Sequence, residues 1–306
     1  MTRLERTMLF VPANRRSMVE KAAASAADAV CIDLEDSIAV DDKPAARTAA
    51  AAAFREVDFG ARIRMLRING LDTPFAYRDV IEVVEPAGDR IDLLMLPKAG
   101  GREDVVWVEK LLAQIEMARG FKRAIGIEAQ IETAAGFLYA REIAQASPRL
   151  EALIFGPGDY SASMQMPSEA IGEFDAHDAV YPGHRWHAVM HTIVAAARAN
   201  GLRAIDGPYA GFKDQAGFER SCGIARAIGF DGKQCIHPAQ LQAANRIFTP
   251  SAEEVARARR LLQAYDEAAT QGRGAATLDG RMIDAANLRM ARVVIEKHRG
   301  SGGTGE

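Results

Sequence analysis

The sequence predicts a (β/α)₈ TIM barrel followed by a C-terminal helical lid. Eight short β-rich runs alternate with longer, alanine-rich segments of helical periodicity. Eight is the number of parallel strands that closes a barrel. The alternation stops at Thr249-Pro250, where the pattern of the chain changes. The chain has 306 residues, 48% of them hydrophobic, which is enough for one barrel with an appendage.

The eight expected strands are short runs rich in aliphatic and β-branched residues. In chain order they cover residues 8–11, 29–33, 63–68, 91–96, 124–128, 153–155, 202–205 and 233–236. Segments between them, such as 17–27 and 186–200, have apolar residues at helical spacing. An open doubly wound sheet is the main alternative, but no G-x-G-x-x-G motif follows the first strand.

The last sixty residues are predicted to be mainly helical. Ser251 and Glu254 have the spacing of a capping box, so a helix is expected from there to about residue 271. Residues 278–280 (LDG) indicate a turn, and a final helix is expected over 285–298.

Two domains follow from this pattern. Residues 1–245 are expected to form the catalytic barrel, and residues 246–306 a lid domain. The glycine-rich tail at 300–305 is expected to be disordered.

Composition argues against several classes of protein. The formal net charge of −3 gives no general attraction to nucleic acid or to a membrane surface. No uncharged apolar run approaches the roughly 20 residues of a membrane helix, and the N-terminus lacks a signal-peptide pattern. Cys31, Cys222 and Cys235 are odd in number and lack metal-ligand spacing, which favours reduced thiols in a cytoplasmic protein.

Charged side chains recur at the carboxyl ends of the predicted strands, where barrels bind their ligands. Alternation along each strand places several of them on a common face. These are Asp33 and Glu35 with Cys31, Arg67 with Asn69, Glu128 and Gln130 with Glu132, and Asp159 after the sixth strand. A single acidic residue here could simply cap the next helix. Several carboxylates at one mouth would repel one another, and a bound cation would resolve that repulsion.

The ligand types indicate which cation. Carboxylates without a cysteine or histidine cluster favour Mg²⁺, with Mn²⁺ as the alternative, over Zn²⁺. His184, His187 and His191 share one helix face but have no evident acidic partner, so core or solvated histidines are the favoured interpretation. Lys98 is expected to line the mouth or to be a paired structural group.

Basic residues follow the first strand at the same mouth. Arg15 and Arg16 precede a helix and Lys21 lies one turn into it. A helix N-terminus with arginines is a reasonable phosphate site, although a solvated helix start would look the same.

At these residues the sequence resembles the citrate lyase β-subunit-like family, and most of all its malyl-CoA/β-methylmalyl-CoA lyases. The resemblance covers nearly the whole chain. It rests on the segments 9–15 (LFVPANR), 32–36 (IDLED), 67–72 (RINGLD), 126–133 (GIEAQIET), 155–160 (FGPGDY), 205–208 (IDGP), 235–238 (CIHP) and 278–284 (LDGRMID). No single segment decides the matter, but their order and spacing together are highly specific.

The resemblance implies a role for each candidate residue in the barrel. Glu132 and Asp159 fall where the family binds Mg²⁺. Arg67 falls where the family contacts substrate and stabilises developing negative charge. Phe10, Arg15 and Lys21 fall on the CoA-binding stretch.

The resemblance also implies a role for the lid. The family's acid/base carboxylate comes from the lid of a neighbouring subunit, which points to Asp284, with Asp279 as the alternative. A homo-oligomer, either a trimer or a hexamer, is therefore expected.

The expected activity is Mg²⁺-dependent cleavage or formation of a 3-hydroxyacyl-CoA. The expected substrates are malyl-CoA or β-methylmalyl-CoA, with an acyl-CoA and a 2-oxo acid as the other small molecules. A citramalyl-CoA lyase, a malyl-CoA thioesterase and a citrate lyase β-subunit are the alternatives on the same scaffold. The connection over 168–181 is expected to shape the acyl pocket. A non-catalytic CoA-binding barrel would not need Arg67, Glu132, Asp159 and Asp284 together. An aldolase that does not use CoA would have little need for the basic cluster.

Overall fold

The computed structural model describes residues 3–181, 184–270, 272 and 275–302. The chain divides into two compact units. One unit runs from Glu5 to Asn245, and the other combines the N-terminal residues before Glu5 with residues 246–306. Each unit is described by itself below.

Eight parallel strands close into a barrel in chain order, with β8 pairing back to β1. The strands are β1 Thr7–Pro12, β2 Ala29–Asp33, β3 Ile63–Arg67, β4 Leu93–Leu96, β5 Gly126–Ile131, β6 Leu150–Phe155, β7 Arg203–Asp206 and β8 Gly232–Cys235. The predicted (β/α)₈ barrel is therefore confirmed. Because all strands run the same way, their carboxyl ends meet at one mouth.

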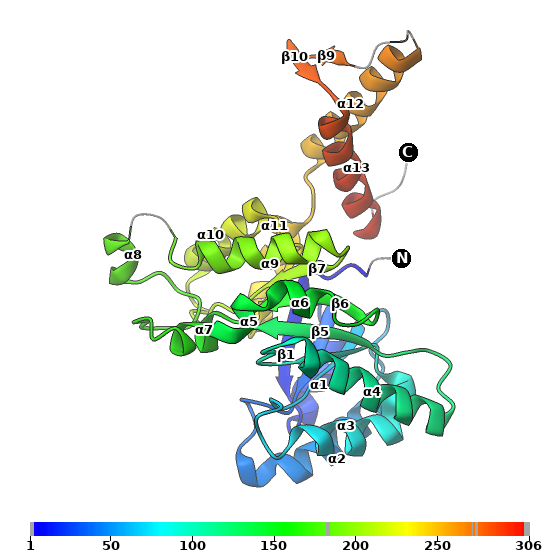
Figure 1. The fold of residues 1–306 in the computed structure, drawn as a ribbon, viewed down its shortest axis with the longest axis vertical. Coiled ribbons are helices and arrows are strands. Elements are labelled where there is room, and N and C mark those ends of the chain that lie inside the picture. The colour runs from blue at the N-terminus through cyan, green and yellow to red at the C-terminus, as the bar shows by residue number, and fades with distance from the viewer. Residues whose placement is uncertain (1–2, 182–183, 271, 273–274, 303–306) are drawn as a thin grey trace. The chain divides into compact units, whose positions relative to one another are not determined.

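Helices pack outside the barrel strands (Figure 1). They are α1 Arg16–Ala23, α2 Lys43–Glu56, α3 Ala76–Ala87, α4 Arg102–Arg119, α5 Ala134–Leu138, α6 Ala140–Ala144, α7 Pro157–Ser163, α8 Ala176–Val180, α9 His187–Ala199, α10 Gln215–Ile228 and α11 Leu241–Phe248. Short 3₁₀ helices are η1 Val40–Asp42, η2 Gly88–Arg90 and η3 Pro238–Gln240.

Apolar side chains fill the barrel interior below the mouth. Met8, Cys31, Met65, Met95 and Ile154 belong to one fully buried cluster contributed by five different strands. This packed floor leaves room for a ligand only toward the carboxyl ends of the strands.

The C-terminal unit is a helical hairpin with a small β-ribbon. Helices α12 Ala252–Thr270 and α13 Ala285–Gly300 flank the antiparallel strands β9 Ala276–Leu278 and β10 Arg281–Ile283. The predicted capping box is confirmed, because the Ser251 and Glu254 side chains each accept the other's backbone N–H, at 3.2 and 2.7 Å.

Part of the predicted disordered tail, residues 303–305, lies outside the described residues, and Gly300 ends α13. Among the residues that the structure describes, no helix is long and apolar enough to cross a membrane.

Candidate active site

A pocket of about 430 Å³ opens at the carboxyl ends of the barrel strands. Its polar wall includes Asp33, Arg67, Gln130, Glu132 and Asp159. Its apolar wall includes Phe10, Met18, Ile171, Pro208 and Ile236. Four of the predicted site residues, Phe10, Arg67, Glu132 and Asp159, thus line one pocket although they are far apart in the sequence.

Arg67 ends β3 and is held in one orientation by acidic neighbours. Asp33 lies opposite it in the β2–β3 ladder, and its two carboxylate oxygens accept from Nε and Nη2 at 2.6 and 2.8 Å. Glu35 pairs with Nη1 at 2.7 Å, and the Phe10 ring centroid lies 5.0 Å from the guanidinium carbon. These contacts fix a planar cation at the wall of the pocket.

Asp33 and Arg67 each shift the pKa of the other. Burial would raise the pKa of the Asp33 carboxyl, but the Arg67 guanidinium, together with hydrogen bonds from Ser37 and the Glu35 backbone N–H, holds that pKa below its ordinary value. Burial would lower the pKa of Arg67, but the Asp33 and Glu35 carboxylates together raise it above its ordinary value. Both groups are therefore ionised at neutral pH.

Glu132 follows β5 and is almost completely buried, with 2% of its surface exposed. Its hydrogen bonds come from two neutral donors, the backbone N–H of Lys98 at 2.8 Å and the Gln130 amide at 2.5 Å. A Cβ on Gly156 would lie 2.2 Å from its Oε2, so only glycine leaves room for the carboxylate there.

The charge of Glu132 is poorly compensated in this environment. Burial, followed by the nearby Glu35 and Asp159 carboxylates, raises the pKa of Glu132 to about 8. Asp159, in the first turn of α7, lies 3.8 Å from the Lys98 ammonium. The Lys98 ammonium is therefore shared between the Asp159 and Glu35 carboxylates, while Glu132 receives only the backbone N–H of this residue.

Lys98 links the carboxylates of three strand ends, and the sequence did not establish this role. Its ammonium pairs with Glu35 and lies 3.9 Å from Asp36, while its backbone N–H binds Glu132. Its φ is +52°, an uncommon conformation for a residue other than glycine. Burial raises the pKa of Glu35 to about 7 although Arg67 and Lys98 lower it.

The donor set fits Mg²⁺. No group of three or more histidine, cysteine or acidic side chains in the described part of the chain could hold a metal by itself. Mg²⁺ commonly takes one or two carboxylates and completes its shell with water and substrate oxygens. Glu132 and Asp159, which line one pocket, would supply that pair. A divalent cation held by them would offset the burial and the carboxylate repulsion that raise the pKa of Glu132.

Two residues expected at the mouth lie elsewhere. The Asn69 side chain donates to Asp79 of α3 and to the Leu34 carbonyl, because β3 ends at Arg67 and its alternation does not continue. Glu128 is fully buried below the mouth, where it pairs with Arg203 of β7. Neither is free to bind a ligand.

The basic cluster begins α1 and is exposed. Arg16 pairs with Glu20 and Glu56 at 2.8 Å, which engages it in ordinary surface ion pairs. Arg15 and Lys21 are exposed. The expected phosphate site is therefore reduced to these two side chains.

Asp284 lies in the C-terminal unit and caps α13. Its Oδ1 accepts the backbone N–H groups of Ala286 and Asn287 at 2.8 and 3.2 Å. The carboxylate is exposed. Asp279, the alternative acid/base, has a φ of +50° in the turn between β9 and β10 and lies 3.7 Å from Arg260.

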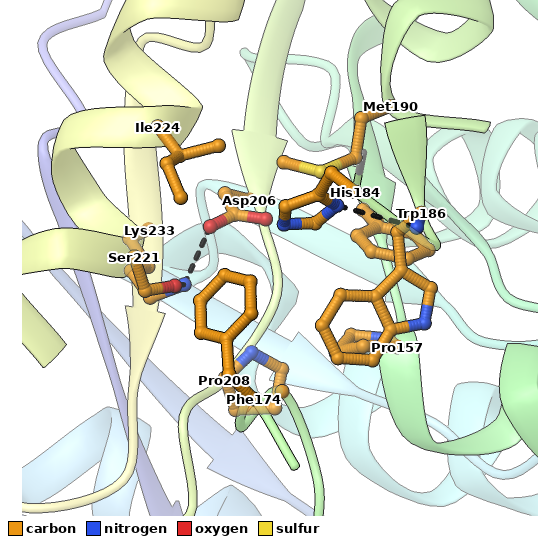
Figure 2. A pocket seen from close by; sticks show the side chains of 12 residues that line it. Pro157, Phe174, His184, Trp186, Met190, Asp206, Pro208, Ser221, Ile224 and Lys233 are labelled. Atoms are coloured by element: carbon orange, nitrogen blue, oxygen red, sulfur yellow. Dashed lines mark hydrogen bonds and ion pairs between the residues drawn. The ribbon is translucent and has the colours of Figure 1, made fainter. Parts of the chain in front are cut away.

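A second cavity is small, and Figure 2 shows the side chains around it. Its volume of about 10 Å³ is no more than one water molecule needs. The Lys233 ammonium donates to Asp206 at 2.5 Å and to Ser221 at 3.0 Å, so the buried charges are paired with each other. This cavity is a packing feature between the strands and the outer helices.

The three histidines do not converge on a metal. The His184 ring faces this second cavity, and its Nδ1 accepts the Trp186 backbone N–H at 3.2 Å. His187 and His191 stack on each other with ring centroids 4.4 Å apart. His187 and His191 are exposed and His184 is half-buried, as expected of solvated or core histidines.

A sequence profile of the HpcH/HpaI aldolase/citrate lyase family matches residues 6–238 of this chain. The chain belongs to the HpcH/HpaI aldolase/citrate lyase family. The L-malyl-CoA/β-methylmalyl-CoA lyase of Rhodobacter capsulatus is 43% identical over 96% of this chain and 95% of its own length. The (3S)-malyl-CoA thioesterase of Cereibacter sphaeroides is 36% identical over 95% and 94%. Membership of this family confirms the resemblance found in the sequence.

Solved structures of the family agree with the fold. CitE from Mycobacterium tuberculosis, in complex with magnesium, acetoacetate and coenzyme A, aligns with a TM-score of 0.76 and 31% identity. The alignment covers 97% of this chain and 98% of that one. The barrel and the segment after it therefore both have counterparts in a known structure.

Proposed function

We propose that this protein is a Mg²⁺-dependent carbon–carbon lyase that cleaves or forms malyl-CoA or β-methylmalyl-CoA. The observation that carries the proposal is the pocket in which a fixed guanidinium, Arg67, faces two carboxylates, Glu132 and Asp159. The identity to a malyl-CoA/β-methylmalyl-CoA lyase along nearly the whole chain supports the same reaction class.

Glu132 and Asp159 would hold the metal, with Mn²⁺ as an alternative to Mg²⁺. When bound there, the cation supplies a Lewis acid for the carboxylate and carbonyl oxygens of a 2-oxo acid such as glyoxylate. The chain's own task is to orient Glu132, which the Lys98 backbone N–H and the Gln130 amide do through hydrogen bonds to its two oxygens.

Arg67 supplies a positive charge beside the substrate oxygen on which negative charge develops during the reaction. In the synthetic direction a base removes a proton from the methyl carbon of acetyl-CoA, and the thioester oxygen becomes an enolate. The guanidinium stabilises that oxygen, and Asp33 and Glu35 keep it aimed without reorganisation. The enolate carbon bonds to the aldehyde carbon of glyoxylate, whose oxygen becomes the hydroxyl group, and cleavage is the reverse.

The base is assigned to Asp284, supplied by the lid of a neighbouring subunit in a trimer or hexamer. Its exposed carboxylate at a helix start is available to another chain. Closure of such a lid would exclude water from the enolate. The CoA moiety is assigned to Phe10, Arg15 and Lys21 beside the first strand.

The three cysteines are buried and free, which supports the proposed cytoplasmic location.

The test is incubation of the purified protein with Mg²⁺ and a panel of 3-hydroxyacyl-CoA thioesters, with products identified by mass spectrometry. The proposal predicts glyoxylate together with acetyl-CoA or propionyl-CoA. Free CoA and malate without acetyl-CoA would indicate a thioesterase, the activity named for the relative from Cereibacter sphaeroides. Absence of any product from these thioesters would refute the proposed class.

A further inference from the structure

We infer that Ile171 determines which 2-oxo acid the site accepts, because its side chain limits the substituent on the carbonyl carbon. This inference rests on the proposed function. The 2-oxo acid with a hydrogen at that position is glyoxylate, and the one with a methyl group is pyruvate. The residue lies in the long connection between α7 and α9, outside the barrel strands.

The Ile171 side chain covers the wall of the pocket next to the proposed metal ligand. It lines the pocket together with Gly158 and Asp159. Three of its side-chain carbons lie 3.2 to 3.4 Å from the point that a Cβ on Gly158 would occupy. Gly158 immediately precedes Asp159, so the isoleucine packs against the backbone that presents this carboxylate.

The backbone of Ile171 and Gly172 is anchored to the segment after β7. The Ile171 carbonyl accepts the Ala210 N–H at 2.9 Å. Gly172 has a φ of +72°, and a Cβ there would lie 2.1 Å from the Pro208 carbonyl oxygen. Only glycine permits that approach, so the isoleucine is held at a fixed distance from the pocket rather than on a free loop.

Phe174 provides a second anchor a few residues further on. In Figure 2 its ring lies beside Pro208 and faces the same cavity as His184 and Trp186. The ring centroids of Phe174 and His184 are 5.1 Å apart, and the Arg220 guanidinium lies 4.5 Å from the phenyl ring. These contacts pack the connection against itself and against α10.

The position of Ile171 in the pocket determines which substituent of the 2-oxo acid its side chain would contact. The carboxylate and carbonyl oxygens of the 2-oxo acid lie at Glu132 and Asp159 if these residues hold the metal. In that arrangement the remaining substituent of the carbonyl carbon would lie against the wall beside Asp159, where Ile171 lines the pocket. A branched side chain there leaves room for hydrogen more readily than for methyl. One methyl group in an apolar pocket changes discrimination by about 10- to 200-fold.

The experiment measures condensation of acetyl-CoA with glyoxylate or with pyruvate in the presence of Mg²⁺. The methyl carbon of acetyl-CoA loses a proton and bonds to the carbonyl carbon, whose oxygen takes up a proton, in both cases. Wild-type protein is expected to prefer glyoxylate. Ile171→Ala should raise the ratio of kcat/KM for pyruvate to that for glyoxylate by about tenfold or more, and Ile171→Val should give a smaller rise.

Val180→Ala is the matched control, because Val180 belongs to the same connection, is 82% exposed and does not line the pocket. This variant should leave the ratio unchanged. If wild-type protein forms malyl-CoA but the ratio in Ile171→Ala stays within twofold of wild type, the inference is wrong and the proposed function stands. An equal loss of both activities would also overturn it. Wild-type protein that condenses neither oxo acid would remove the proposed function itself.

Discussion

Replacing Glu132 by glutamine tests the energetic cost of the buried carboxylate. Raising the pKa of this group from 4.5 to about 8 means that the folded state disfavours its ionised form. Both folded and unfolded states carry a neutral group below pH 4.5, so no cost exists there. The cost grows as the pH rises from 4.5 to about 8 and then stays constant, at about 5 kcal/mol.

Glutamine keeps the shape of the side chain and removes its charge. The Lys98 N–H and the Gln130 amide both donate to Glu132, and a glutamine oxygen can accept only one of them at its original place. Losing the other bond costs about 1–3 kcal/mol. Without Mg²⁺, Glu132→Gln should therefore be more stable than wild type by about 2–4 kcal/mol at pH 9 and slightly less stable at pH 5.

The assay is urea-induced unfolding at pH 5, 7 and 9, with a chelator and then with Mg²⁺. Mg²⁺ should stabilise the wild type at pH 9 and have little effect on the variant, because binding to the native state raises its stability. Glu142→Gln, at an exposed position of α6, is the control and should change stability by less than about 0.5 kcal/mol. If wild-type stability does not fall between pH 5 and 9, and the glutamine variant gains nothing at pH 9, the reasoning is wrong.

Four other substitutions have separate expected outcomes. Asp159→Asn should weaken Mg²⁺ binding by at least about tenfold in calorimetry, and unchanged affinity would contradict its role as a ligand. Arg67→Lys should lower kcat by about 10²–10³ with Mg²⁺ affinity retained; near-normal turnover would show that a bidentate cation is not needed. Asp284→Asn should stop Mg²⁺-dependent exchange of the acetyl-CoA methyl protons into D₂O, followed by NMR, and continued exchange would redirect attention to Asp279. Lys21→Ala should raise KM for the CoA thioester more than it changes kcat, and an unchanged KM at low salt would exclude this contact.

The barrel could be predicted because its strands are short aliphatic runs at regular intervals. The residues at which each strand begins and ends could not be predicted. The fifth strand is expected at 124–128 and is found at Gly126–Ile131. Glu128 and Gln130 interrupt its apolar pattern, and only the folded barrel supplies Arg203 and Gln234 to satisfy them. The sixth strand begins three residues before its expected start, at Leu150.

The sequence predicted the pocket position of candidate residues that lie on a strand or directly after it, because side chains alternate along a strand. It did not predict the position of residues further on, where the chain has turned away from the strand. Arg67 and Glu132 follow from their position on or directly after a strand. Asn69 was misplaced because β3 ends two residues earlier and the backbone turns its side chain toward Asp79. The link between Lys98 and Glu132 depends on a left-handed backbone at a lysine, for which no residue pattern exists.

The most direct measurement of the central claim is the anomalous diffraction of crystals soaked in Mn²⁺ at pH 8. One strong peak is expected, bonded to a carboxylate oxygen of Glu132 and one of Asp159, and no peak is expected at this place in Glu132→Ala crystals. Wild-type crystals without a peak between these two carboxylates, or with the metal bound elsewhere in the barrel, would contradict it.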